Sequence, residues 1–143
     1  MRQVVRDTAA TLAPGAAAVH EEQRSEHEIV LTLEPRAAEA SRLAVSHIDA
    51  ASRSVFVELG EASTFEVWEA DKELARPQLM TLLTVATQVG FIERTWRHGG
   101  TILKAEVDFT EAAPALGPST SYFGPERLLA SADIVVRRFS SYK

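Results

Sequence analysis

The stretch "SVFVELGEASTFEVWE", residues 54–69, alternates apolar and polar side chains on both sides of a loop that contains a glycine. Alternation with a period of two is typical of strands that have one buried and one solvated face. We expect Leu59 to pair with Phe65 across the loop. This register places Val57 opposite Val67 on the core-facing side. The stretch therefore predicts a β-hairpin within an antiparallel sheet.

The other side of this hairpin holds our candidate partner-binding residues. The same register places Phe56 opposite Trp68. It also places Glu58 opposite Glu66. If this face is open to solvent, two aromatic rings among carboxylates form an interface suited to a partner with apolar and basic groups. If a helix covers the face, the aromatic residues belong to the core, which is the more common situation for aromatic residues on strands.

Several further elements are predicted in the amino-terminal half. Helical spacing of apolar residues indicates a short helix within residues 1–13, and alternation indicates a strand over 28–34. The alanine-rich and then charged segment 16–28 is interpreted as a helix extension or a solvated connector. Segment 36–53 fits either a helix or a strand at 43–48 followed by a turn, and we choose the strand.

Two helices are predicted in the carboxyl-terminal half. The first begins at Pro77 and ends at Gly90, because proline suits the first helical position and glycine the position after the last. Its buried stripe is Leu79, Leu82, Leu83, Ala86 and Val89. The second begins at Pro125, and its stripe is Leu128, Ala132, Val135 and Phe139.

The run His98-Gly99-Gly100 has two interpretations. In some hydrolases such a run supplies backbone N–H groups to an oxyanion, whereas in a hairpin the two glycines form the turn. The hairpin register pairs His98 with Thr101 and places Trp96 opposite Leu103 on a buried face. It accounts for the alternation on both sides of the turn, and the chain has no G-x-S-x-G nucleophile motif. We therefore predict a turn and no catalytic residue.

The remaining polar residues predict no metal or cofactor. His20 and His27 flank a glutamate-rich run, but their spacing is not that of a metal motif, and such runs are usually solvated. His47 is interpreted as a hydrogen-bonded structural histidine. Glu58, Glu66 and Glu69 could be arranged as an acid and base pair, but surface strands commonly carry such carboxylates, so they do not single out a catalytic site. The chain has no cysteine, which excludes thiolate chemistry and fits a reducing cytoplasm.

Composition limits the class of protein. The 143 residues are 45% hydrophobic and 24% charged, as in ordinary globular domains, and we expect one domain over residues 1–143. The net charge of −5 disfavours nucleic-acid binding. No apolar stretch is long enough to span a membrane, and Arg6 and Asp7 interrupt any secretory signal. We expect a cytoplasmic protein.

Together these patterns predict an α+β domain with an antiparallel meander of about five or six strands and helices packed against it as a single pair of layers. Small size, acidity and the lack of catalytic motifs lead us to expect a non-enzymatic accessory protein that binds another protein. Our leading hypothesis is an inhibitor of the immunity or antitoxin kind that occludes a basic toxin enzyme. A small-molecule binder or enzyme remains an alternative, which requires a deep pocket between sheet and helix.

The predicted element order also resembles that of the small acidic chaperones of type III secretion, over most of the chain and in architecture alone. The resemblance implies a homodimer that holds an unfolded segment of a secreted effector. An apparent extra strand departs from the pattern of that family.

Overall fold

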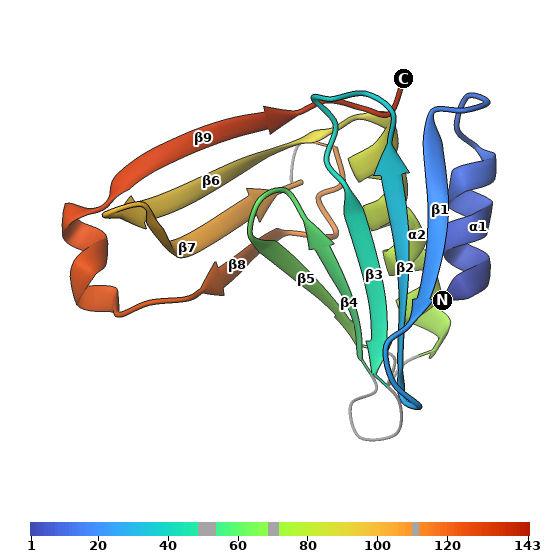
Figure 1. Cartoon of the computed structure of the whole chain (residues 1–143), viewed down its shortest axis with the longest axis horizontal. Coiled ribbons are helices and arrows are strands. Elements are labelled where there is room, and N and C mark those ends of the chain that lie inside the picture. Colours follow the sequence, from blue (N-terminus) through green and yellow to red (C-terminus); the bar gives the residue numbers. More distant parts are fainter. Residues whose placement is uncertain (49–53, 69–71, 110–111) are drawn as a thin grey trace.

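The computed structural model describes the chain except for residues 49–53, 69–71 and 110–111, and it contains two antiparallel sheets (Figure 1). In chain order the elements are α1 (Arg2–Ala10), β1 (Ala17–Gln23), β2 (Glu28–Pro35), β3 (Leu43–Ile48), β4 (Ser54–Leu59), β5 (Ser63–Trp68), α2 (Lys72–Gln88), β6 (Phe91–His98), β7 (Thr101–Asp108), β8 (Pro118–Tyr122), the 3₁₀ helix η1 (Glu126–Ser131) and β9 (Asp133–Phe139). The predicted α+β class, with an antiparallel meander and helices against it, is confirmed. The second sheet is an addition to that prediction.

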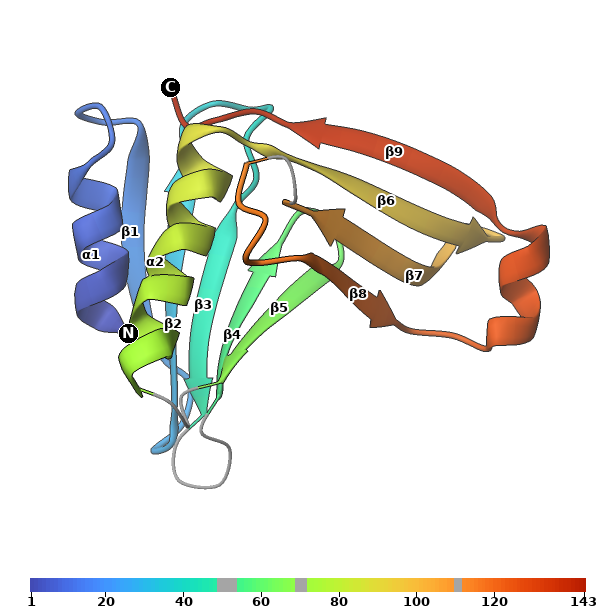
Figure 2. The same cartoon turned by 180° about the vertical axis from the view of Figure 1, so that it is seen from behind.

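The first sheet is a five-stranded meander in the order β1-β2-β3-β4-β5. Figure 2 shows α1 and α2 lying across it. Every second side chain of each strand points to the helix side, because strand side chains alternate between faces. The buried residues on that side are Leu31, Leu33, Leu43, Val45, Val55, Val57, Phe65 and Val67. They form one hydrophobic cluster with Val5 of α1 and with Leu82 and Leu83 of α2.

The second sheet, in the order β8-β7-β6-β9, begins beside β5 and extends away from the helices (Figure 1). Two hydrogen bonds join β8 to β5. The backbone N–H of Thr64 donates to the Ser121 hydroxyl at 3.3 Å, and the Ser119 hydroxyl donates to the Thr64 carbonyl at 2.8 Å. Near the helices this sheet adds Phe91 to the core, and the adjoining Phe109 follows β7, with 5.6 Å between the two ring centroids. The two sheets therefore share one hydrophobic core.

The predictions for the amino-terminal half are confirmed for α1, β2 and β3, but the one for segment 16–28 is wrong. Most of that segment forms the edge strand β1, which pairs antiparallel with β2 from Ala17 opposite Pro35 to Gln23 opposite Ile29. Alanine and glutamate favour helices, but pairing with the edge of β2 outweighs this weak local preference. The turn predicted after β3 lies outside the described residues.

The main helix α2 begins at Lys72 rather than at Pro77, so the proline lies inside it and removes one backbone hydrogen bond without ending it. The predicted stripe is buried at Leu79, Leu82, Leu83 and Ala86. Val89 was predicted to share the stripe, but it lies beyond the end of the helix and is 64% exposed. Among the described residues, no helix combines the length and the apolar character that crossing a membrane requires.

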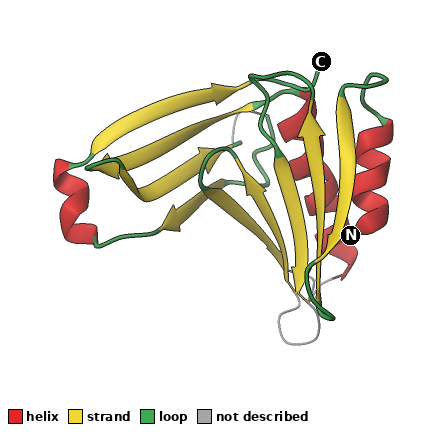
Figure 3. Ribbon diagram, viewed as in Figure 1, coloured by secondary structure: helices red, strands yellow, loops and turns green. Residues whose placement is uncertain are grey.

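The prediction of a long helix after Pro125 is wrong. The chain there forms η1 and then the strand β9, which ends at Phe139. Figure 3 shows η1 at the end of the second sheet that is farthest from α1 and α2. Ile134, Val135 and Val136 are consecutive β-branched residues, which lose rotamer freedom in a helix and pack well on a sheet. Their preference for a strand outweighs the helical spacing of the apolar residues around them.

The hairpin of β6 and β7 turns at Gly99 and Gly100, as predicted. Their φ angles are 55° and 82°, a region that glycine adopts at no steric cost. His98 pairs with Thr101 and is exposed beside the turn. The His-Gly-Gly run is therefore a hairpin turn.

The predicted register of this hairpin fails beyond the turn. A β-bulge between Trp96 and Arg97 places Trp96 opposite Lys104 and leaves Leu103 as an extra residue on β7. An extra residue reverses which side chains of a strand face the core from that point on. Leu103 is buried, but Trp96 is only half-buried and lies on the opposite face.

Candidate functional site

The outer face of the first sheet, on the side away from α1 and α2, carries the residues selected from the sequence. Phe56 lies opposite Glu66, and Glu58 lies opposite Thr64. Phe56 is half-buried, whereas both glutamates are exposed. The structure thus makes Phe56 and Glu66 direct cross-strand neighbours, with Glu58 beside them on the same face of β4.

The register of this hairpin differs by two residues from the prediction, because its loop is shorter. Leu59 pairs with Ser63 rather than with Phe65. A shift of two preserves which face each side chain occupies, whereas a shift of one would reverse it. Trp68 pairs with Ser54 instead of Phe56, and its side chain lies outside the described part of the chain.

Phe56 lies in a row of side chains that crosses all five strands. In order from β1 to β5 the row is Glu22, Val30, Ser46, Phe56 and Glu66. Val30 is buried, while the glutamates at both ends of the row are exposed. The outer face therefore has a small apolar centre with an acidic residue at each margin.

Carboxylates outnumber the basic groups on this face. The carboxylates are Glu22, Glu28, Glu34, Glu58 and Glu66, and the basic residues are Arg24 and Arg42. Arg42 Nε lies 3.3 Å from Glu34 Oε2, and Arg24 Nε lies 3.3 Å from Glu22 Oε2. Glu58 is exposed and makes no ion pair with the described residues. Among the described residues of this face, the negative charge around Phe56 is therefore uncompensated.

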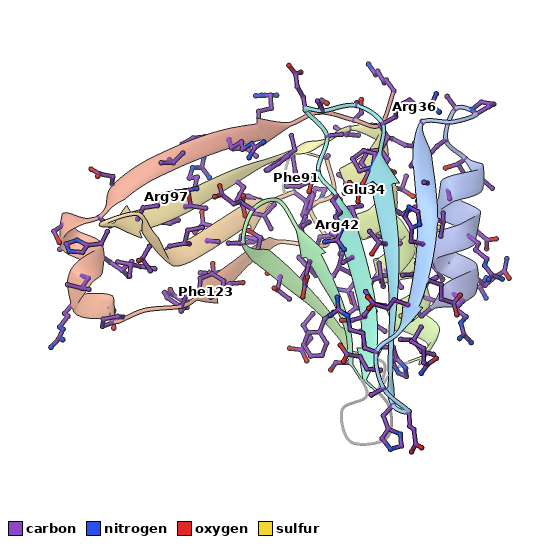
Figure 4. The ribbon with its side chains drawn as sticks, in the orientation of Figure 1. Glu34, Arg36, Arg42, Phe91, Arg97 and Phe123 are labelled. Carbon is purple, nitrogen blue, oxygen red and sulfur yellow. The ribbon has the colours of Figure 1, made fainter. Side chains whose placement is uncertain are left out.

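Two hollows adjoin this face. A hollow of about 600 Å³ lies at the junction of the two sheets. Figure 4 labels two of its lining residues, Arg42 just before β3 and Phe123 just after β8. It is lined by Arg42, Ala44, Glu58, Leu59, Gly60, Glu61, Ala62, Ser63, Thr64, Ile102 and Phe123. A second hollow of about 460 Å³ is lined by Phe56 and Glu66 together with Pro118 and Thr120 of β8. Each of the three predicted residues that the structure describes therefore lines one of the two hollows. Glu58 lines the larger hollow, and Phe56 and Glu66 line the smaller one.

The buried Glu93 of β6 holds the β4–β5 loop that forms one wall of the larger hollow. Its side chain is on the face of the second sheet that packs on this loop, and only 1% of the residue is exposed. Its carboxylate accepts hydrogen bonds from the backbone N–H of Glu61 at 2.8 Å and of Ala62 at 3.0 Å. It also accepts one from the Ser63 hydroxyl at 2.7 Å. A Cβ at Gly60 would lie 2.7 Å from the carboxyl group, so this contact requires glycine.

The role of Glu93 was missed from the sequence, because the predicted register puts Trp96 on the buried face and therefore Glu93, three residues earlier on the same strand, on the solvated one. The bulge on β7 shifts the pairing by one residue, so that Glu93 instead shares the buried face with Val107, and no local pattern marks its position. An ion pair between Arg97 and Glu61 further attaches β6 to the same loop. The two sheets are thus fixed relative to each other beside the candidate site.

The described residues offer little for catalysis or metal binding. Nowhere within them do three His, Asp or Glu side chains come together as a metal site would require. The four histidines lie on separate elements, His20 on β1, His27 in the following turn, His47 on β3 and His98 at the β6–β7 turn. Burial, and secondarily the charge of Glu34, raises the pKa of Tyr142 above its ordinary value. The hydroxyl of Tyr142 donates to backbone carbonyls of β2 and the β2–β3 connection, which is a structural role.

The outer face of the second sheet is chemically different. One row across its four strands consists of Tyr122, Lys104, Trp96 and Ile134. Lys104 Nζ lies 4.1 Å from the centroid of the Trp96 ring, a cation–π contact. The charged residues on this face of β6, β7 and β9 are Arg94, Lys104, Arg138, Glu106 and Asp108, so this face lacks the acidic excess of the outer face of the first sheet.

Comparisons of this chain with protein-family models, with curated proteins and with solved structures found no match. Function is therefore inferred from the arrangement of the residues alone.

Proposed function

We propose that this protein is a non-enzymatic accessory protein that binds another protein through the acidic outer face of its first sheet. The observation that carries the proposal is the cluster of half-buried Phe56 with exposed Glu58 and Glu66 on the face that the helices leave uncovered. Aromatic residues are enriched in interfaces, where they act as anchors that lose contact with water, and Phe56 beside a hollow is suited to this role. The partner that fits this chemistry presents an apolar side chain among lysine or arginine residues.

Within this class, we propose an inhibitor of the immunity or antitoxin kind that covers the substrate site of a basic toxin enzyme. Enzymes that act on nucleic acids carry basic clefts, because they must neutralise phosphates. An acidic face of fixed geometry is complementary to such a cleft. The rigid attachment of the β4–β5 loop through Glu93 supports this proposal, because a preorganised surface loses less entropy on binding.

The test is affinity capture with the wild-type chain and with two variants of equal charge change. Glu58→Lys reverses a charge in the centre of the candidate site, where no described contact depends on it. Glu126→Lys makes the same change on η1, at the far end of the second sheet. We expect a basic enzyme, identified by mass spectrometry, to be retained by the wild type and by Glu126→Lys but not by Glu58→Lys. Its activity should be inhibited in the same order.

Other outcomes separate the alternatives. Capture of a secreted effector through an unfolded segment would favour the chaperone-like function. Equal capture by both variants would place the binding surface elsewhere and contradict the proposal.

A second candidate function, binding of a small molecule, is favoured by the hollow of about 600 Å³ at the junction of the sheets. Its volume is in the range of small-molecule sites, and it combines Arg42 and Glu58 with the apolar Ile102 and Phe123. The hollow lies between two sheets rather than between sheet and helix. A metabolite screen by thermal shift, with Phe123→Ala as the control, tests this function. A ligand that stabilises both proteins equally does not occupy the hollow.

A further inference from the structure

Strand β9 is an edge strand whose apolar residues are exposed on both faces. No described strand of the sheet pairs with its outer side (Figures 1 and 2), and the segment before β3 approaches only just beyond its end, where Ala40 bridges to Ser140. Ile134 is 58% exposed, Val135 42% and Val136 59%. An exposed apolar edge is a template for pairing with another strand, and soluble proteins usually cover or charge such an edge. We infer that β9 pairs antiparallel with β9 of a second copy of this chain.

The sequence of β9 is complementary to itself in one register. A two-fold axis perpendicular to the sheet relates two antiparallel copies, so the residue on the axis lies opposite itself. With Val135 on the axis, Ile134 lies opposite Val136 of the second copy. Asp133 then lies opposite Arg137 of the second copy. The apolar pair and the charged pair each occur twice by symmetry, because each copy contributes the same strand.

Neighbouring registers lack this complementarity. With Val136 on the axis, Asp133 faces Phe139 of the second copy, and Ile134 faces Arg138. With Arg137 on the axis, two guanidinium groups face each other, and like charges directly opposite are destabilising. The charges of β9 therefore select the register centred on Val135.

The charged residues of β6 continue this pattern of opposite charges on both sides of the interface between the two β9 strands, which we call the seam. Within one copy, Glu93 lies opposite Arg137 and Arg97 lies opposite Asp133. In the paired sheet, Glu93 and Arg137 of one copy are followed by Asp133 and Arg97 of the second, so the signs alternate across four strands. The Arg137 guanidinium is centred 4.8 Å from the Phe139 ring, and the N–H groups at its edge can still donate across the seam.

On the same face, Thr95 and Val135 of one copy are followed by Val135 and Thr95 of the second. The result is a continuous sheet of eight strands, and the acidic face of each copy belongs to its other sheet. This interface is separate from the proposed partner-binding site, so a dimer presents two copies of that site.

Sedimentation velocity over a concentration series tests the seam. We expect the wild type to dimerise, and we expect Asp133→Arg and Arg137→Asp each to be monomeric, because each variant places like charges opposite each other. An equimolar mixture of these two variants should form a heterodimer, because the charges are then complementary at both positions. Arg127→Asp on η1 is the control for charge, and it should remain dimeric. Circular dichroism verifies that each variant is folded.

Three results would overturn the inference. They are a wild type that is monomeric at every concentration, a dimer that persists in both single variants, and a mixture that stays monomeric.

A cross-linking experiment keeps the test independent of the charge variants. The chain has no cysteine, so Val135→Cys introduces a single thiol that faces its own symmetry copy. In Val135→Cys the two Cβ atoms lie directly opposite each other, near the distance that a disulfide requires. In Ile134→Cys the two Cβ atoms are offset along the strands, because Ile134 lies opposite Val136 of the second copy. Mild oxidation should link Val135→Cys rapidly and Ile134→Cys slowly. Equal rates would show that β9 does not pair in this register.

Discussion

Replacing Glu93 with glutamine should destabilise the protein although it changes only one atom of the side chain. The carboxylate accepts two backbone hydrogen bonds and one from a hydroxyl, and it is 1% exposed. Glutamine retains one acceptor oxygen, and its NH₂ group would face a backbone N–H, so at least one buried donor loses its partner. Hydrogen bonds to charged groups contribute about 1.5–3 kcal/mol each, and an orphaned buried donor costs about 1–3 kcal/mol. We therefore expect Glu93→Gln to lower the free energy of unfolding by about 2–4 kcal/mol.

Glu106→Gln is the matched control. Glu106 lies on the adjacent strand with its side chain on the other face, and its contacts with Arg94 and Lys104 are surface ion pairs 3.7 Å and 3.6 Å long. Such pairs contribute about 0–1 kcal/mol. Urea unfolding compares the free energies of the two variants, with the same dependence on urea concentration required of both. Hydrogen exchange at the backbone amides of Glu61 and Ala62 should become faster in Glu93→Gln alone. A loss below about 1 kcal/mol, equal to that of the control, would refute the role assigned to Glu93.

Three further predictions concern the fold and are checked by denaturant unfolding. Gly90→Ala should lower the free energy of unfolding more than Gly99→Ala, because a Cβ at Gly90 would overlap the backbone oxygen of Phe139, whereas a Cβ at Gly99 meets open space and carries only the φ penalty of about 1–2 kcal/mol. Leu103→Ala should lower the free energy of unfolding by about 2–5 kcal/mol, and Trp96→Ala should lower it by less because Trp96 is only half-buried. The reverse order would contradict the β-bulge. Burial raises the pKa of Tyr142, so the folded state keeps a proton that the unfolded chain loses, and stability should fall as pH rises above about 10. Tyr142→Phe should reduce that fall, and an unchanged pH profile would contradict the assignment.

Four strands of the first sheet, β2 to β5, could be predicted from the sequence because their signals are local, whereas β1 was missed because only its pairing with β2 makes it a strand. Alternation along residues 54–68 and the apolar residues of β2 fixed which side chains face the helices, and a register error of two residues left those faces unchanged. The turn at Gly99 and Gly100 was equally local, since it depends on two residues with positive φ.

Beyond the β6–β7 hairpin and its turn, the second sheet could not be predicted, because its decisive features depend on distant contacts. The bulge on β7 shifts the pairing of the two strands by one residue, and Glu93 is a buried residue only because the β4–β5 loop supplies its donors. The apolar residues of β9 have the spacing of a helix, but the segment forms a strand because it pairs with β6. For the candidate site, the sequence placed Phe56 and Glu66 on one face but did not reveal the hollows beside them.

The rate at which this protein associates with its partner tests most directly whether the acidic face of the first sheet binds a basic protein. Exposed charges are screened beyond about 10 Å at 0.1 M ionic strength, so attraction between the two proteins should accelerate association at low salt. Once a partner is captured, surface plasmon resonance over a salt series should show an association rate that falls steeply with salt for the wild type and for Glu126→Lys. The rate should be lower and less dependent on salt for Glu58→Lys, whereas Phe56→Ala should mainly accelerate dissociation. A rate independent of salt and unchanged in Glu58→Lys would contradict the claim.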